Sequence, residues 1–181
     1  MSDKLSSAFW KIQNELELSG YLKEVCLHIT EKTFSKTVLE EILINNGVNH
    51  SIAKVDLIHL IFEYVKIALE DNILTVNEKQ DIKLLKLWFG IQAGDFYFHN
   101  SSAVENIITY QLSKIYRDNF ITEEEALLKV DLQEIFDLSF DQMNDYAKTE
   151  ASLSIQQGAD PKNLDVFFTQ KEYFKLKPTS K

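Results

Sequence analysis

The chain has 181 residues, 45% of them hydrophobic, and a formal net charge of −9. This length and hydrophobic content suffice for one buried core, so we expect a single domain. The charge argues against a nucleic-acid ligand, because phosphate contacts need a basic face and the 19 Lys and Arg residues are dispersed among 28 Asp and Glu. Only five Gly and two Pro, together with long segments of helical periodicity, predict an all-α protein.

The sequence also bears on the compartment. No segment approaches about 18 uncharged apolar residues, and the start at Met1–Trp10 lacks a basic region followed by an apolar run. We therefore expect a cytoplasmic protein with no membrane insertion. Cys26 is the only cysteine, which forbids an internal disulfide and fits a reducing compartment. Its apolar neighbours predict a buried side chain and not a reactive thiol.

Residues 1–50 are predicted to form an N-terminal helical extension packed on the core. Apolar residues at helical spacing predict helices at 3–18 and 21–29. A third helix begins after Thr33 or Ser35, either of which can cap it, and Asn46-Gly47 supplies a left-handed ending.

Residues 51–158 are predicted to form the core, and 159–181 a short C-terminal helix, at 163–168, with a loosely ordered tail. Core helices are expected at about 52–70, 76–89, 101–117, 123–138 and 141–157, with Ser101 or Ser102 capping the third and Asp141 the fifth. The predicted architecture is a single-domain helical bundle.

Aromatic residues cluster between the second and third core helices. Phe96-Tyr97-Phe98-His99 is expected to be a loop packed on the core, because an isolated strand has no partner in a helical fold. The alternative is an exposed recognition surface. Trp10 and Trp88 are expected to be packing residues.

One pattern, Asp-Asn-apolar-apolar-Thr-x-x-Glu, occurs twice, at 71–78 and at 118–125. Apolar residues recur around it at the same offset, pairing Leu57 with Val104, Leu60 with Ile107, Ile61 with Ile108, Val65 with Leu112, Ala68 with Ile115, Leu69 with Tyr116, Leu85 with Leu132 and Phe89 with Phe136. Shared apolar positions on both sides of the same turn predict two copies of one helix-turn-helix hairpin, at 53–89 and 101–138.

Helix capping explains most of the repeated pattern. Each Asn can take the left-handed conformation that ends a helix. Each Thr then caps the next helix, and the Glu three residues on completes a capping box. Asp71 and Asp118 are different, because a carboxylate at a helix C-terminus faces the negative end of the dipole, at a cost of roughly 0.3–1 kcal/mol.

Two interpretations account for these aspartates. Each carboxylate can accept hydrogen bonds from the opening amides of the following helix. Alternatively, if the two turns come together, a cation such as Ca²⁺ or Mg²⁺ neutralises the converging carboxylates. The metal ligands would be Asp71, Glu78, Asp118 and Glu125. The spacing is not that of an EF-hand loop.

The two turns resemble those of the TerB-like tellurite-resistance family, whose helical domains carry two turns of the form Asp-Gly-x-x-[Ser/Thr]-x-x-Glu between paired helices. The resemblance covers about residues 52–150, and the matching residues are Asp71, Thr75, Glu78, Asp118, Thr122 and Glu125. Asn72 and Asn119 stand where Gly is usual in the family. The resemblance implies an all-helical interaction module, not an enzyme, in bacterial stress-response systems, with an acidic site that can bind calcium.

Two hypotheses for function come from different classes. The first is a cytoplasmic TerB-like module in stress response or defence that binds a protein partner. The alternative is an acidic immunity protein that inhibits a cognate toxin with its carboxylates. A metal-dependent hydrolase is a third choice, although the chain lacks a Glu-x-x-His ligand motif and no catalytic residues are predicted.

Overall fold

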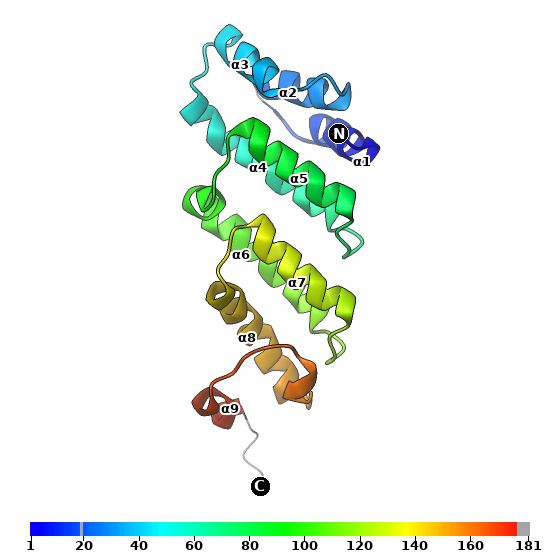
Figure 1. Ribbon diagram of the computed structural model, residues 1–181, viewed down its shortest axis with the longest axis vertical. Coiled ribbons are helices and arrows are strands. Elements are labelled where there is room, and N and C mark those ends of the chain that lie inside the picture. The colour runs from blue at the N-terminus through cyan, green and yellow to red at the C-terminus, as the bar shows by residue number, and fades with distance from the viewer. Residues whose placement is uncertain (19, 177–181) are drawn as a thin grey trace. The chain divides into compact units, whose positions relative to one another are not determined.

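The computed structural model describes residues 1–18 and 20–176, and these contain helices and no strand (Figure 1). The prediction of an all-α protein is confirmed for this part of the chain. It divides into two compact units, Met1–His99 and Asn100–Lys181, called here unit 1 and unit 2 and described separately. The division falls inside the predicted core of 51–158. In the described ranges, no helix has the length and apolar character needed to cross a bilayer.

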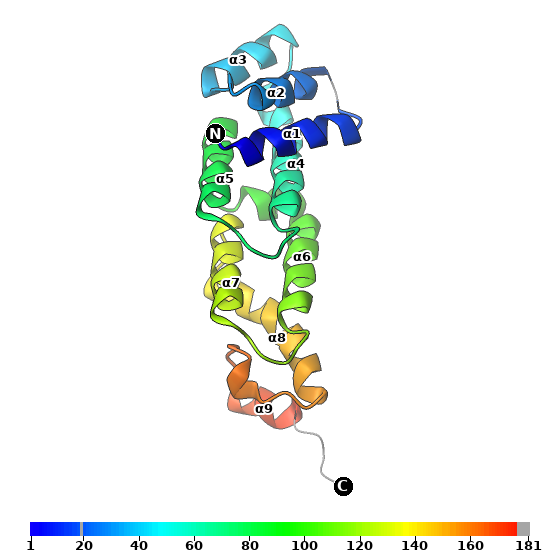
Figure 2. The same ribbon diagram turned by 90° about the vertical axis from the view of Figure 1, so that its right-hand side faces the viewer.

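Unit 1 is built on an antiparallel pair, α4 (His50–Ala68) and α5 (Val76–Phe89), which lie side by side in Figures 1 and 2. α1 (Asp3–Glu15) packs against α4, α5 and α2 (Gly20–Thr30). α3 (Lys36–Asn45) packs against α2 and α5. The N-terminal helices thus cover the α4–α5 pair, and the rings of Phe9 and Tyr64, both fully buried, meet at 6.2 Å between centroids.

Local capping sets the helix ends in unit 1. Ser2 caps α1 by accepting a hydrogen bond from the backbone N–H of Leu5, and Ser35, one of the two expected caps, does the same for α3. Gly90 ends α5 in the left-handed conformation, with φ of 65°. A Cβ there would lie 3.3 Å from the His50 ring, so the site requires glycine for its backbone and its close neighbour.

Three residues of unit 1 test the predicted burial. Cys26 is fully buried, as predicted, and burial raises the pKa of its thiol to about 12. Trp88 packs with its ring 5.3 Å from that of Phe34. The expectation for Trp10 was wrong, because 61% of this residue is exposed.

The aromatic segment 96–99 is the first turn of α6 (Asp95–Ile115), so the predicted loop was wrong. Phe96 is fully buried and Phe98 is 83% exposed. The helix is interrupted at Asn100, where φ is −157° and ψ is 68°. The Asn100 side chain accepts a hydrogen bond from the N–H of Ala103 and takes the capping role expected of Ser101 or Ser102. The division between the two units falls at this interruption.

Unit 2 contains the remainder of α6, then α7 (Glu123–Ile135), α8 (Phe140–Gln156), the 3-10 helix η1 (Pro161–Asn163) and α9 (Gln170–Leu176). α8 packs against α7 and α9. Its cap is Ser139 and not Asp141, because the Ser139 hydroxyl accepts from the N–H of Gln142 in a capping box. The helical turn expected at 163–168 was wrong. Residues 177–181 of the predicted tail lie outside the described residues.

The two repeated turns have the same backbone form. Asn72 has φ of 61° and Asn119 has φ of 65°, the left-handed conformation predicted for both. Thr75 and Thr122 cap α5 and α7, each in a complete capping box. All sixteen residues of the apolar pairs that recur at the same offset are buried. The turns reverse the chain so that each helix buries the apolar face that the sequence indicates.

We expect Asn72→Ala to lower the free energy of unfolding by about 1 kcal/mol, because a Cβ without a local polar partner disfavours the left-handed region. Asn72→Gly is the matched control and should change it by less than about 0.5 kcal/mol. Urea denaturation of the full chain measures both. Equal losses in the two variants would show that the asparagine is needed for something other than its backbone conformation.

Candidate functional site

In the first turn, both predicted metal ligands are engaged in backbone capping. Asp71 Oδ1 accepts a hydrogen bond from the N–H of Ile73 at 3.1 Å. Glu78 Oε2 accepts from the backbone N–H of Thr75 at 2.9 Å and from its hydroxyl at 2.6 Å. These contacts satisfy donors at the helix start.

The second turn repeats the same contacts. Asp118 Oδ1 accepts from the N–H of Phe120 at 3.2 Å. Glu125 Oε2 accepts from the Thr122 N–H at 2.9 Å and from the Thr122 hydroxyl at 3.0 Å. Each aspartate therefore accepts a hydrogen bond from the amide two residues on, which lies within the turn. The capping interpretation placed the donor later, among the opening amides of the following helix.

The first turn has a further partner in Lys4 of α1. Its Nζ lies 2.6 Å from Glu78 Oε1 and 3.8 Å from Asp71 Oδ2. Glu78 is fully buried, so the ammonium compensates a carboxylate that has left water. The hydrogen bond to Glu78 raises the pKa of Lys4 above its ordinary value.

A second carboxylate of α5, Asp81, is also buried against α1. It accepts hydrogen bonds from the Ser2 backbone N–H at 3.2 Å, from the Tyr64 hydroxyl at 3.2 Å and from the Ser2 hydroxyl. Burial, followed by the charge of Asp81, raises the pKa of Tyr64. The start of α1 is therefore fastened to two acidic residues of the α4–α5 pair.

These contacts decide how well the first turn suits a divalent cation. Glu78 has one oxygen on Thr75 and the other on Lys4, so a metal at this carboxylate would have to displace an ammonium ion. In residues 1–18 and 20–176, no three His, Cys, Asp or Glu side chains form a group that suits a metal. Asp71 and Glu78 lie in unit 1, whereas Asp118 and Glu125 lie in unit 2. A common site of the four stays a prediction.

A groove in unit 2 is the feature that the sequence did not indicate. Its volume is about 560 Å³, within the range of roughly 300–1,000 Å³ that is usual for ligand sites. Two helices, and η1 with the segment that follows it, form its three walls. Its lining residues are Ala126, Lys129, Val130 and Gln133 of α7, Phe140, Met143, Asn144 and Ala147 of α8, and Pro161, Lys162, Asp165, Val166 and Phe167.

Hydrogen bonds hold the third wall to both helices. The Asn144 side chain donates to the Phe167 carbonyl at 3.1 Å and accepts from the Phe167 N–H at 3.0 Å. Lys129 Nζ donates to the backbone carbonyl of Asp165 at 2.6 Å and to its carboxylate at 2.8 Å. Leu164 is fully buried beneath the segment. The groove is therefore built into unit 2 by contacts on α7 and α8.

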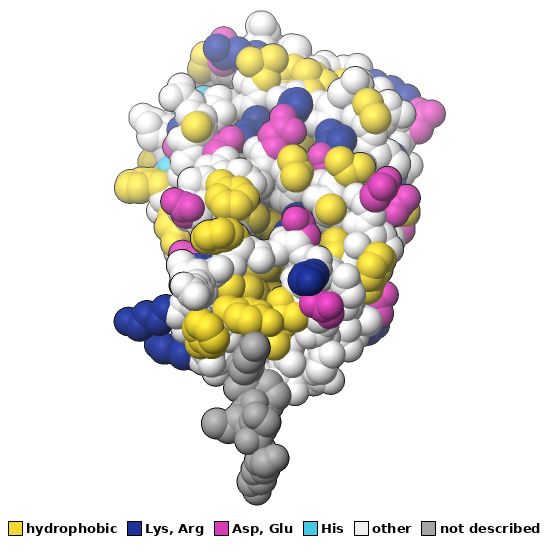
Figure 3. Space-filling view, turned by 60° about the horizontal axis from the view of Figure 1, so that its bottom comes forward, with side chains coloured by type: hydrophobic (Ala, Val, Ile, Leu, Met, Phe, Trp, Pro, Cys, Tyr) yellow, Lys and Arg dark blue, Asp and Glu magenta, His cyan; other side chains and the backbone are white. Residues whose placement is uncertain are grey.

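The rim of the groove is apolar and open to solvent. Val130 is 59% exposed, Phe140 64% and Phe167 63%, whereas Met143 at the base is 4% exposed. In the lower part of Figure 3, hydrophobic side chains gather in one area, with cationic and acidic side chains beside it. Sequence periodicity marks the apolar positions of α7 and α8 but does not tell an exposed Phe140 from a buried one.

Comparison of this chain with protein-family models, with curated proteins and with solved structures finds no match. The TerB-like resemblance of the two turns therefore stays a prediction.

We expect Lys4→Met to lower the free energy of unfolding by about 1–3 kcal/mol, because the buried Glu78 carboxylate loses its ammonium partner. Lys11→Met is the control, since the Lys11–Glu70 pair is exposed on both sides and should contribute less than about 1 kcal/mol. The pKa of Lys4 is raised in the folded state, so its contribution is complete below the ordinary lysine value of 10.5 and is lost as pH rises through the folded-state value. On the alkaline side, the difference in free energy of unfolding between wild type and Lys4→Met, measured by denaturation, should narrow above pH 10.5.

The predicted common cation site has its own test. If the four carboxylates hold calcium, millimolar calcium raises the melting temperature of the wild type, and the double variant Asp71→Ala, Asp118→Ala loses that response. Isothermal titration calorimetry should show a heat of calcium binding for the wild type and none for the double variant. A melting temperature that calcium leaves unchanged would contradict the cation site and leave the carboxylates with their capping contacts and the Lys4 ion pairs.

Proposed function

We propose that the chain is a protein-interaction module that binds its partner through the groove of unit 2. The observation that carries the proposal is an apolar groove with exposed Phe140, Phe167 and Val130 along its rim. Apolar side chains that gather in one exposed area mark interaction sites on soluble proteins. Aromatic side chains beside a preformed hollow are the residues that most often anchor a partner.

The exposure of the rim favours a protein partner over a small ligand. A small-molecule site usually encloses most of its ligand's surface. Here three rim side chains are each more than half exposed, so the occupant keeps a face toward solvent. A protein segment meets this condition, because its outer face carries polar residues and continues into the rest of the partner.

The repeated turns support the finer part of the proposal, that the α4–α5 and α6–α7 pairs are copies of one TerB-like hairpin. The two turns share their left-handed Asn, their capping box and the hydrogen bond that each Asp accepts from the amide two residues on. The TerB-like resemblance is the reason to expect a bacterial stress-response or defence setting. Interaction through the groove requires no reaction chemistry.

The alternative, an acidic immunity protein, uses a different surface. An inhibitor of that kind presents carboxylates to a toxin, whereas the groove presents aromatic and aliphatic side chains. A partner that contacts only acidic surface away from the groove would favour the alternative.

The test is site-specific photo-crosslinking in the cells to which the chain is native. A photoreactive side chain in place of Val130 should give a defined adduct, and one in place of Ile44, which is 77% exposed on α3 of unit 1, should not. The adduct should be lost when Phe140→Ala and Phe167→Ala are introduced. Because both phenylalanines are largely exposed, these changes should alter the free energy of unfolding by less than about 1 kcal/mol. No adduct at the groove, or the same adduct at position 44, would overturn the proposal.

A further inference from the structure

The polar side chains of the groove differ in whether they already have partners. Lys129 is bound to Asp165, and the Asn144 amide is bound to the Phe167 backbone. Lys162 is an exposed residue and makes no ion pair within residues 1–18 and 20–176. Lys162 is therefore the lining cation that stays available to an incoming ligand.

The local charge of the groove is opposite to that of the chain. Its charged lining residues are Lys129, Lys162 and Asp165, whereas the whole sequence has a net charge of −9. Since Asp165 neutralises Lys129 at 2.8 Å, the charge that remains is the Lys162 ammonium. An anionic group on the ligand complements it.

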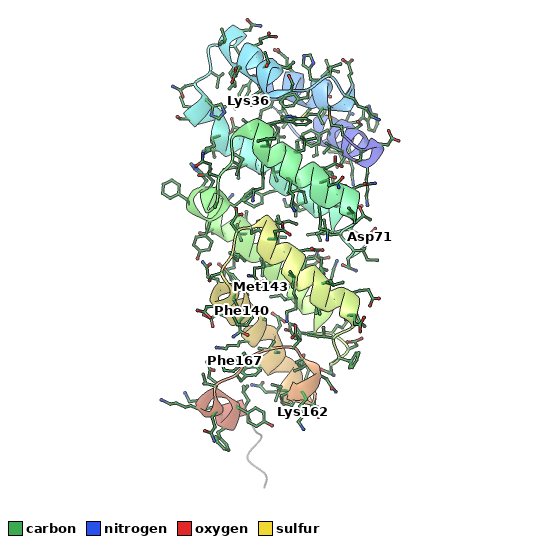
Figure 4. All side chains as sticks on the ribbon, in the orientation of Figure 1. Lys36, Asp71, Phe140, Met143, Lys162 and Phe167 are labelled. Atoms are coloured by element: carbon green, nitrogen blue, oxygen red, sulfur yellow. The ribbon has the colours of Figure 1, made fainter. Side chains whose placement is uncertain are left out.

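Lys162 lies apart from the aromatic part of the groove. Figure 4 places Phe140, Met143 and Phe167 together toward one end, with Lys162 toward the other. A ligand that fills the groove therefore meets apolar side chains along most of its length and one cation at its end.

The two helical walls favour a helix as the shape of that ligand. Ala126, Val130 and Gln133 follow one face of α7, and Phe140, Met143 and Ala147 follow one face of α8. Rows of side chains at this spacing pack against the ridges of another helix. A helix with one apolar face leaves its polar face toward the open rim.

We infer that the occupant of the groove is an amphipathic helix of a partner protein, with apolar side chains spaced i, i+3 or i+4, and i+7, and an Asp or Glu that pairs with Lys162. This inference rests on the proposed function and names the chemistry of the partner. The apolar side chains contact Phe140, Met143 and Phe167, and the carboxylate fixes the direction in which the helix lies.

Selection from a displayed library of amphipathic helical peptides tests the inference on the full chain. Peptides selected by the wild type should carry Asp or Glu at a fixed offset from their apolar positions. Lys162→Glu should weaken these peptides about tenfold, because an exposed attractive pair becomes a repulsive one. Selection with this variant should then favour Lys or Arg at the same offset.

Lys36→Glu is the matched control, because Lys36 is an exposed lysine at the start of α3 in unit 1 (Figure 4). It should leave the affinity of the selected peptides unchanged. Peptides that lose binding on Phe140→Ala and Phe167→Ala but show no preference for an acid would overturn the inference and leave the proposed function standing.

Two other outcomes also contradict the inference. Failure to select any peptide that depends on Phe140 and Phe167 would overturn the inference, whereas the proposed function is decided by the crosslinking test at Val130. Palmitate provides a further arm, because a fatty acid also joins an apolar body to a carboxylate. Palmitate binding that depends on Lys162, without peptide binding, would replace the partner helix with a free fatty acid.

Discussion

The reversal of the chain between paired helices is the constraint on which the rest of this structure depends. Each reversal needs one residue in the left-handed conformation, supplied by Asn72 and by Asn119, and a Thr-Glu capping box at the start of the returning helix. A turn this short fixes which faces of the two helices meet. The buried apolar residues on both sides of each turn follow from that geometry.

Beyond the turns, contacts between segments far apart in the sequence decide which side chains each unit covers and which it exposes. In unit 1, α1 covers the α4–α5 pair and brings Lys4 to the otherwise uncompensated carboxylate of Glu78. In unit 2, the segment after η1 is held to α7 by Lys129 and to α8 by Asn144. In unit 1 the acidic side chain is thus paired and covered by α1, whereas in unit 2 the apolar groove stays open to solvent.

Local signals in the sequence were enough to predict the helical class, most helix ends and both turns. Capping residues act within four positions of a helix end, so Thr75 and Thr122 identify two helix starts without knowledge of the fold, and the start of α3 was narrowed to Thr33 or Ser35. The exposed Trp10 and Phe140 and the helical start of α6 at 96–99 escaped prediction. Tertiary packing decides whether a large apolar side chain is covered, and one sequence does not contain that information.

The candidate sites show the same contrast between local sequence signals and tertiary contacts. The capping roles of Glu78 and Glu125 are readable from spacing alone, whereas the partnership of Lys4 with Glu78 joins residues far apart in the sequence. The groove likewise joins residues 126–147 to residues 161–167. The periodicity of the sequence indicates neither the ion pair nor the groove.

The buried thiol of Cys26 makes unit 1 observable by itself. A thiol reagent attacks the thiolate, and a side chain with no exposed surface and a pKa raised to about 12 offers almost none at neutral pH. Alkylation must therefore wait until the helices around Cys26 separate. Because this is the single cysteine of the chain, the rate of its modification records opening events in the first ninety-nine residues, free of signal from the remainder.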